Sequence, residues 1–129
     1  MRRAARLGAT WALASALLAA AVPAVSGETT HVYPVKMTIS VDRSEHKIKG
    51  TVESDAPSFF CEESTVRLYR VEPGKDKKVN FVKPVYGKWG MRTTSRLSGS
   101  KVYAEVSKYH LPDRPVVCLA ARTRTVTAP

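Results

Sequence analysis

The chain has 129 residues, of which 43% are hydrophobic and 25% are charged, and its 21 Lys and Arg against 11 Asp and Glu give a formal net charge of +10. This length has room for one domain. The balance of apolar and charged residues is that of an ordinary globular protein and excludes a disordered chain, a collagen and a coiled coil.

Residues 1–27 have the pattern of a cleaved export signal. Arginines near the start precede an apolar run of about a dozen residues, and small residues that suit a signal peptidase follow at 22–24 and 25–27. The alternative is a single membrane anchor, but a helix that crosses a bilayer needs roughly 20 apolar residues. We therefore expect a secreted, extracellular protein. Since no second apolar stretch and no lipid-accepting cysteine follow, we expect no transmembrane anchor after cleavage.

Two cysteines, Cys61 and Cys118, remain after the signal. Removing the signal takes three arginines and no acids, so the mature chain of about 102 residues (129 − 27) carries a charge of +7, from 18 basic and 11 acidic residues. A domain of this size buries a modest share of its surface and gains from a covalent constraint. An even number of cysteines in an exported chain favours a disulfide between them over two free buried thiols.

Alternation of apolar and polar residues with a period of two predicts strands from the start of the mature chain. Residues 28–44 are expected to form an N-terminal segment and a first strand, with apolar side chains at every second position from Val35 to Val41. The same period recurs at Ile48–Val52 and at Val66–Arg70, inside a core domain expected at 45–127.

Turn residues divide the second half of the chain into further strand-like segments. Pro84, which has no N–H to donate, either places the strand-like segment before it on a sheet edge or ends that segment, and a turn at Tyr86–Trp89 follows. The segments are Val79–Val82, Met91–Thr94, Val102–Val106 and one last strand at Val116–Val126 that contains Cys118. About seven strands and no helical period predict an all-β fold, a single antiparallel β-sandwich, immunoglobulin-like or transthyretin-like, with one disulfide.

Several short motifs follow one another in a fixed order. They are G-x-V-x-S at 50–54, Cys61, V-x-L-Y at 66–69, G-K-W at 87–89, a strand with adjacent Tyr and Ala at 102–106, and Cys118. In this order the chain resembles a small β-sandwich module of exported bacterial proteins, a family largely of unknown function. The resemblance covers most of residues 45–127, and it implies a fold and no activity.

No catalytic or metal-binding pattern is visible in the sequence. His31, His46 and His110 lie in three separate segments without the spacing of zinc ligands. Ser98–Ser100 resembles a nucleophile turn only superficially, and the adjacent Glu62 and Glu63 would point to opposite faces of a strand. We therefore predict a protein that is not an enzyme and that uses no cofactor and no metal.

Basic residues are the most prominent chemical feature of the mature chain. Lys75, Lys77 and Lys78 cluster in one expected loop, and Lys83, Lys88, Arg92 and Arg96 follow. One interpretation is solubility and protection of sheet edges. The other is attraction to an anionic cell-wall polymer or acidic glycan outside the cell. The export signal and the lack of aromatic residues interleaved with the basic ones disfavour nucleic acid as a partner.

Aromatic residues give a second candidate surface. Tyr86, Trp89 and Tyr103 would form a sugar-stacking platform if they shared a face, and the simpler alternative for Trp89 is the core tryptophan of a sandwich.

These patterns lead to two hypotheses for function. The first is a secreted, non-catalytic binding module of the cell envelope or extracellular space. The alternative is a secreted inhibitor or effector that blocks an extracellular protein through an exposed loop at Ala56–Glu63, tethered at Cys61.

Overall fold

A computed structural model describes residues 29–129, and the predicted export signal lies outside this range. The described chain is all-β, with one short 3-10 turn, η2 (Pro57–Phe59). Its strands are β1 (His31–Tyr33), β2 (Val35–Asp42), β3 (Lys47–Ser54), β4 (Val66–Arg70), β5 (Lys77–Val82), β6 (Lys88–Arg92), β7 (Lys101–Val106), β8 (Tyr109–His110), β9 (Val116–Cys118), β10 (Ala121–Arg122) and β11 (Val126–Thr127).

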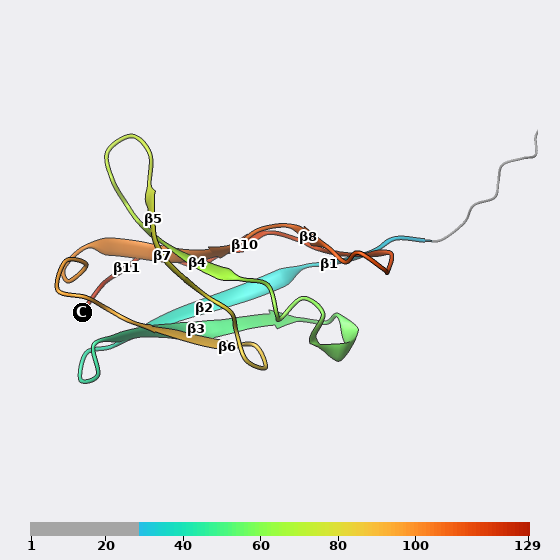
Figure 1. Ribbon diagram of the computed structural model, residues 1–129, viewed down its shortest axis with the longest axis horizontal. Coiled ribbons are helices and arrows are strands. Elements are labelled where there is room, and N and C mark those ends of the chain that lie inside the picture. The colour runs from blue at the N-terminus through green and yellow to red at the C-terminus, as the bar shows by residue number, and fades with distance from the viewer. Residues whose placement is uncertain (1–28) are drawn as a thin grey trace, which may run out of the picture.

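Two antiparallel sheets pack face to face and enclose the main core (Figure 1). One sheet has the order β2-β3-β6, and the other has the order β10-β7-β4-β5, with β11 also paired to β7. The core between them includes Ile48 and Val52 from the first sheet and Val66, Leu68 and Val102 from the second. The predicted alternation at β2, β3 and β4 is confirmed, because the inward positions are buried and the positions between them are more exposed. In β7 the outward Tyr103 is buried as well, 5% exposed, so burial does not alternate along that strand.

A third, smaller sheet lies at one end of the sandwich and carries the disulfide. It has the order β1-β9-β8, and β1 pairs with β9 in parallel, which the prediction of a purely antiparallel fold did not include. The predicted disulfide between Cys61 and Cys118 is confirmed. Both sulfur-bearing residues are buried with Ala56, Leu111 and Val116 in a second, smaller core.

The prediction of one last strand at 116–126 is wrong, because that segment forms three short strands. β9 belongs to the small sheet, whereas β10 and β11 both pair with β7 in the large sheet. Between β10 and β11, the Thr123 hydroxyl accepts a hydrogen bond of 2.9 Å from the backbone N–H of Ala104. The backbone N–H of Ala104 therefore donates to a side chain instead of a backbone carbonyl group. The ladder of backbone hydrogen bonds along β7 is interrupted at this point.

Gly50 allows an unusually close approach between strands of the first sheet. It pairs with Trp89 on β6 and with Ile39 on β2. A Cβ atom at this position would lie 1.9 Å from the backbone oxygen of Thr38 and 2.8 Å from a ring carbon of Trp89. Because Gly50 has no side chain, the Trp89 ring can lie against the backbone of β3. Trp89 belongs to the main core and is 5% exposed. The strand expected at 91–94 is observed at Lys88–Arg92, so Lys88 and Trp89, which were expected in a turn, belong to the strand.

Within residues 29–129, the structure has no helix long and apolar enough to cross a membrane.

Candidate functional site

A groove opens between β5 and β6, which are edge strands of the two facing sheets. Its volume is about 280 Å³. The half-buried Val79 and the buried Leu97 give it an apolar base. Five basic residues, one threonine and one asparagine complete the lining: Arg70, Lys77, Lys78, Arg92, Arg96, Thr94 and Asn80. No acidic residue is among the described residues that line it, and we call it the basic groove.

The basic groove combines residues that the sequence places in two separate groups. Lys77 and Lys78 come from the start of β5, whereas Arg92 ends β6 and Arg96 lies in the turn that follows. They meet because the chain passes from one sheet to the other at 83–87, so β5 and β6 become neighbours across the open side of the sandwich. We call the side of the groove formed by Arg92 and Arg96 the arginine wall and the side formed by Lys77 and Lys78 the lysine wall. The ammonium group of Lys78 lies 5.7 Å from the centre of the Phe81 ring.

The other predicted basic residues lie outside the basic groove. Lys75 is exposed in the turn between β4 and β5, a hairpin that projects from the body of the molecule (Figure 1). Lys83 lines a different hollow together with Arg67 and Lys108, and Lys88 lies beside Lys49 on the first sheet. The loop cluster at 75–78 is thus divided, with Lys77 and Lys78 in the groove and Lys75 beyond it.

Most of the positive charge in the basic groove is uncompensated. Arg70 is paired with Glu72, with 2.5 Å between a guanidinium nitrogen and a carboxylate oxygen. The ion pairs found within residues 29–129 include none of the other four cations, Lys77, Lys78, Arg92 and Arg96. Like charges that gather around one hollow raise the positive potential there and attract an anion.

The arginine wall is held by backbone hydrogen bonds and by a core anchor. The backbone N–H groups of Leu97 and Ser98 both donate to the carbonyl oxygen of Thr94, at 3.0 and 3.2 Å. Leu97 belongs to the main core, so the turn that carries Arg96 is fixed to the sandwich. The backbone that carries Arg96 therefore loses little conformational freedom when a ligand binds.

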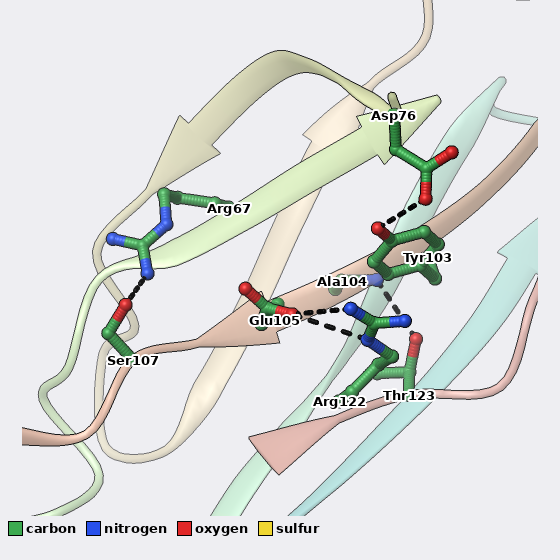
Figure 2. A network of polar contacts seen from close by, with 8 residues as sticks. All are labelled: Arg67, Asp76, Tyr103, Ala104, Glu105, Ser107, Arg122 and Thr123. Carbon is green, nitrogen blue, oxygen red and sulfur yellow. Dashed lines mark hydrogen bonds and ion pairs between the residues drawn. The ribbon is translucent and has the colours of Figure 1, made fainter. Parts of the chain in front are cut away.

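The lysine wall is held by a polar network at the base of the β4–β5 hairpin (Figure 2). The Tyr103 hydroxyl donates a hydrogen bond of 2.7 Å to a carboxylate oxygen of Asp76, and the other oxygen accepts from the backbone N–H of Glu72 at 3.2 Å. The Arg122 guanidinium lies 4.3 Å from the centre of the Tyr103 ring and is also paired with Glu105. Asp76 directly precedes Lys77, so the network positions the start of β5.

The same hydrogen bonds shift the pKa values of Asp76 and Tyr103. The Tyr103 hydroxyl, then the Glu72 N–H, hold the pKa of Asp76 below its ordinary value of 3.8. Burial, and then the hydrogen bond to the Asp76 carboxylate, raise the pKa of Tyr103 above 10.0. Because the folded-state pKa of Asp76 is lowered, its contribution to stability is complete above the ordinary value and is lost as the pH falls through the folded-state value.

We predict that Tyr103→Phe raises the pKa of Asp76 toward 3.8 and reduces the acid sensitivity of the fold below about pH 4. The variant keeps the ring that stacks on Tyr69, with 5.5 Å between ring centroids, and removes only the donor. NMR titration of the Asp76 carboxyl carbon measures the pKa directly. Tyr69→Phe is the matched control, and an Asp76 pKa that is equal in Tyr103→Phe and in the parent would contradict the assigned hydrogen bond.

The three aromatic residues of the expected platform do not share a face. Tyr86 is 78% exposed and meets Phe59 edge to face, with 5.8 Å between ring centroids. Trp89 is buried in the main core, which agrees with the simpler alternative. Tyr103 is covered by Arg122 and stacks on Tyr69, on the opposite side of β7 from the core residues Val102 and Ala104. A single sugar-stacking platform of these residues is therefore not formed.

The loop at Ala56–Glu63 presents an aromatic side chain on a strained backbone. Phe59 is 48% exposed, and Ser58 and Phe59 have left-handed φ angles of 55° and 59°. The loop is held by the buried Cys61 and by Glu62, whose carboxylate accepts a hydrogen bond of 3.2 Å from the backbone N–H of Ser54. Left-handed φ at residues other than glycine costs free energy and is frequent at binding loops.

Groups of three or more His, Cys, Asp and Glu side chains that could hold a metal ion are not present in the described part of the chain. His31 and His110 lie on strands of the small sheet, and His46 is in the turn between β2 and β3 with a φ of 52°. The carbonyl oxygen of His46 accepts hydrogen bonds from the backbone N–H and hydroxyl of Thr93. The backbone of His46 therefore joins the turn between β2 and β3 to the residue that follows β6.

Comparison of the chain with protein-family models, with curated proteins and with solved structures finds no match. The resemblance to a module of exported bacterial proteins therefore stays a prediction, as do the immunoglobulin-like and transthyretin-like topologies.

Proposed function

We propose that the protein is a secreted, non-catalytic binding module that holds an anionic extracellular polymer, such as a cell-wall polymer, in the basic groove. One observation carries the proposal: four cations without an ion pair within residues 29–129, from β5, β6 and the turn after β6, line one hollow that no described acidic residue lines. Charges of one sign lining a concave surface focus the electrostatic field and raise the local concentration of an oppositely charged ligand.

Protection of a sheet edge explains only part of this arrangement. Lysines on the exposed edge strand β5 oppose pairing with another chain, which accounts for Lys77 and Lys78. Arg92 lies on the other edge strand, β6, and is accounted for in the same way, whereas Arg96 lies in the turn that follows β6 and protects no edge. Edge protection also does not require these residues to line one hollow, and their shared hollow therefore favours a binding surface over a solubility device.

We predict that Lys77→Gln, Lys78→Gln, Arg92→Gln and Arg96→Gln together lower affinity for an anionic polymer by about tenfold or more, since each exposed charge contact contributes a few tenths of a kcal/mol or more. Retention of the parent on isolated cell wall or on an anionic glycan column should fall steeply as salt rises through about 0.15 M, where the Debye length is about 8 Å. The free energy of unfolding should change little, because all four positions lie at the surface.

A variant with the same charge loss outside the basic groove is the control. Lys36, Lys83, Lys88 and Lys108 are exposed and do not line the groove, and their replacement by Gln should leave most of the affinity intact. An equal loss of affinity in both variants would show that the total charge of the protein, and not the basic groove, determines binding. Retention that does not depend on salt would contradict the proposal.

The strained, exposed Phe59 favours a second candidate function, that of a secreted inhibitor or effector that blocks a protein partner through the loop at Ala56–Glu63. Tyr86 and Val85, which are 78% and 68% exposed, extend the apolar surface beside Phe59. A pulldown from culture medium and cell wall separates the two functions. Release of a captured protein by Phe59→Ser, but not by the groove variant, would favour the blocking loop.

A further inference from the structure

We propose that a second hollow, beside the small sheet, binds one acidic sugar, that is, a hydroxylated ring with a single anionic group. The hollow lies where the chain leaves β7 at residues 107–108 and enters β8, and residues 60 and 63–65 form another side. We call it the junction hollow. Among the described residues, it shares no lining residue with the basic groove. The inference therefore does not rest on the proposed function, which concerns a polymer in that groove.

Positive charge exceeds negative charge in the junction hollow. Arg67, Lys83 and Lys108 line it together with one carboxylate, that of Glu63. The ion pairs found within residues 29–129 include none of these four side chains. Three cations around one carboxylate leave a positive potential that attracts an anionic group.

A hydrogen bond holds the Arg67 guanidinium at the junction hollow. Arg67 lies between the buried Val66 and Leu68 on β4, so its side chain points away from the main core. Ser107 follows the buried Val106 and lies on the same outer face of the large sheet. The guanidinium donates to the Ser107 hydroxyl (Figure 2). An arginine that is already positioned loses less conformational freedom when it binds an anionic group.

The polar groups of the junction hollow favour a hydroxylated ligand over a bare anion. Ser64, Thr65 and Ser107 offer hydroxyl groups that donate and accept hydrogen bonds. The Glu63 carboxylate only accepts, so it can bind the hydroxyl groups of a sugar. Beside an anion without hydroxyl groups, the same carboxylate would be repulsive.

The apolar surface and the size of the junction hollow match one sugar ring. Phe60, Tyr109 and Leu111 contribute apolar side chains, and Tyr109 is 44% exposed. The CH groups of a pyranose ring can pack against such surfaces. A volume of about 310 Å³ is at the lower end of the range for ligand sites, which suits a single sugar and not an oligosaccharide.

NMR titration of ¹⁵N-labelled protein with four small molecules at low salt tests the inference. Glucuronate and glucose 6-phosphate carry the negative charge on different groups, glucose lacks the charge, and acetate lacks the hydroxyl groups. We expect at least one of the two acidic sugars to shift the amide resonances of residues 63–67 and 107–111 most. Its affinity should exceed those of glucose and acetate by about fivefold or more.

Three variants separate the charge of the ligand from its hydroxyl groups. Lys83→Gln with Lys108→Gln should lower the affinity for that acidic sugar by about three- to tenfold. Lys36→Gln with Lys88→Gln removes the same charge at exposed positions outside the junction hollow and should change this affinity by less than about twofold. Glu63→Ala should weaken binding of the acidic sugar and strengthen binding of acetate, because it removes both an acceptor and a negative charge.

The remaining outcomes contradict the inference, each in a different way. Acetate that binds as tightly as both acidic sugars would show a general anion site and overturn the assignment to a sugar. An equal loss of affinity in the two lysine pairs would overturn the location of the site. If neither acidic sugar shifts residues 63–67 and 107–111, the junction hollow is not a binding site. In all three cases, retention of an anionic polymer by the basic groove is measured separately, so the proposed function stands or fails independently.

Discussion

Replacement of Cys61 and Cys118 by alanine is expected to lower the free energy of unfolding by about 4 kcal/mol, a large part of the roughly 5–15 kcal/mol of a typical small domain. The bond links residues 57 positions apart, and without it the unfolded chain gains the conformational freedom of that whole loop. It also joins the loop at 56–63 to β9, the centre strand of the small sheet, so the smaller core around Ala56 and Leu111 should loosen first.

Urea and thermal unfolding followed by circular dichroism measure this loss, and a fall in melting temperature of roughly 20 °C is expected for a domain of this size. Reduction of the parent protein is the control, because it breaks the bond without changing the side chains and should reproduce most of the effect. A loss below about 1 kcal/mol in both would show that the disulfide is not a main source of stability. Alkylation of both cysteines in unreduced native protein would contradict the bond itself.

Substitution of Gly50 by alanine is expected to destabilise the fold by about 3 kcal/mol, at the upper end of the cost of overpacking. The added Cβ would lie 1.9 Å from the Thr38 carbonyl oxygen and 2.8 Å from the Trp89 ring. The first contact is with backbone, so relief requires β2 and β3 to separate and the core tryptophan to move.

Gly90→Ala is the matched control, since Gly90 lies on β6 next to Trp89 and a Cβ there would have its nearest neighbour at 3.6 Å, an ordinary contact. We expect its effect on the free energy of unfolding to stay within about 0.5 kcal/mol. Fluorescence of Trp89 should change in Gly50→Ala and not in Gly90→Ala. Equal stabilities for the two variants would contradict the close approach at Gly50.

The strands that could be predicted from the sequence are those with one buried and one exposed face. In β2, β3 and β4, burial alternates along the strand, and the apolar residues alternate in the same way. The short strand β1 carries no such pattern, because His31 and Val32 are exposed and its position is set by pairing with β9. The pairing of β1 with β9 therefore leaves no periodic signal in β1.

The last third of the chain shows a second limit. Residues 116–126 contain many strand-forming residues, which predict one strand, but the chain changes sheets between Cys118 and Ala121. β-Propensity reports how well a residue fits a pleated, half-buried surface and not which sheet it joins.

The candidate site was predictable only in part for the same reason. The charge cluster at 75–78 is visible in the sequence, and two of its lysines line the basic groove. Their meeting with Arg92 and Arg96 depends on the passage of the chain between sheets at 83–87, which is a tertiary feature. The contact of Tyr103 with Asp76 joins residues 27 positions apart, and no motif marks it.

NMR titration of ¹⁵N-labelled protein with poly(glycerol phosphate), an anionic polymer, at low salt shows whether the basic groove is the binding surface. We expect the amide resonances of residues 77–80 and 92–97, together with the Nε–H resonances of Arg92 and Arg96, to shift most, and added salt to reverse the shifts. Shifts concentrated at the loop 56–63 and Tyr86, or spread evenly over all exposed lysines, would contradict it.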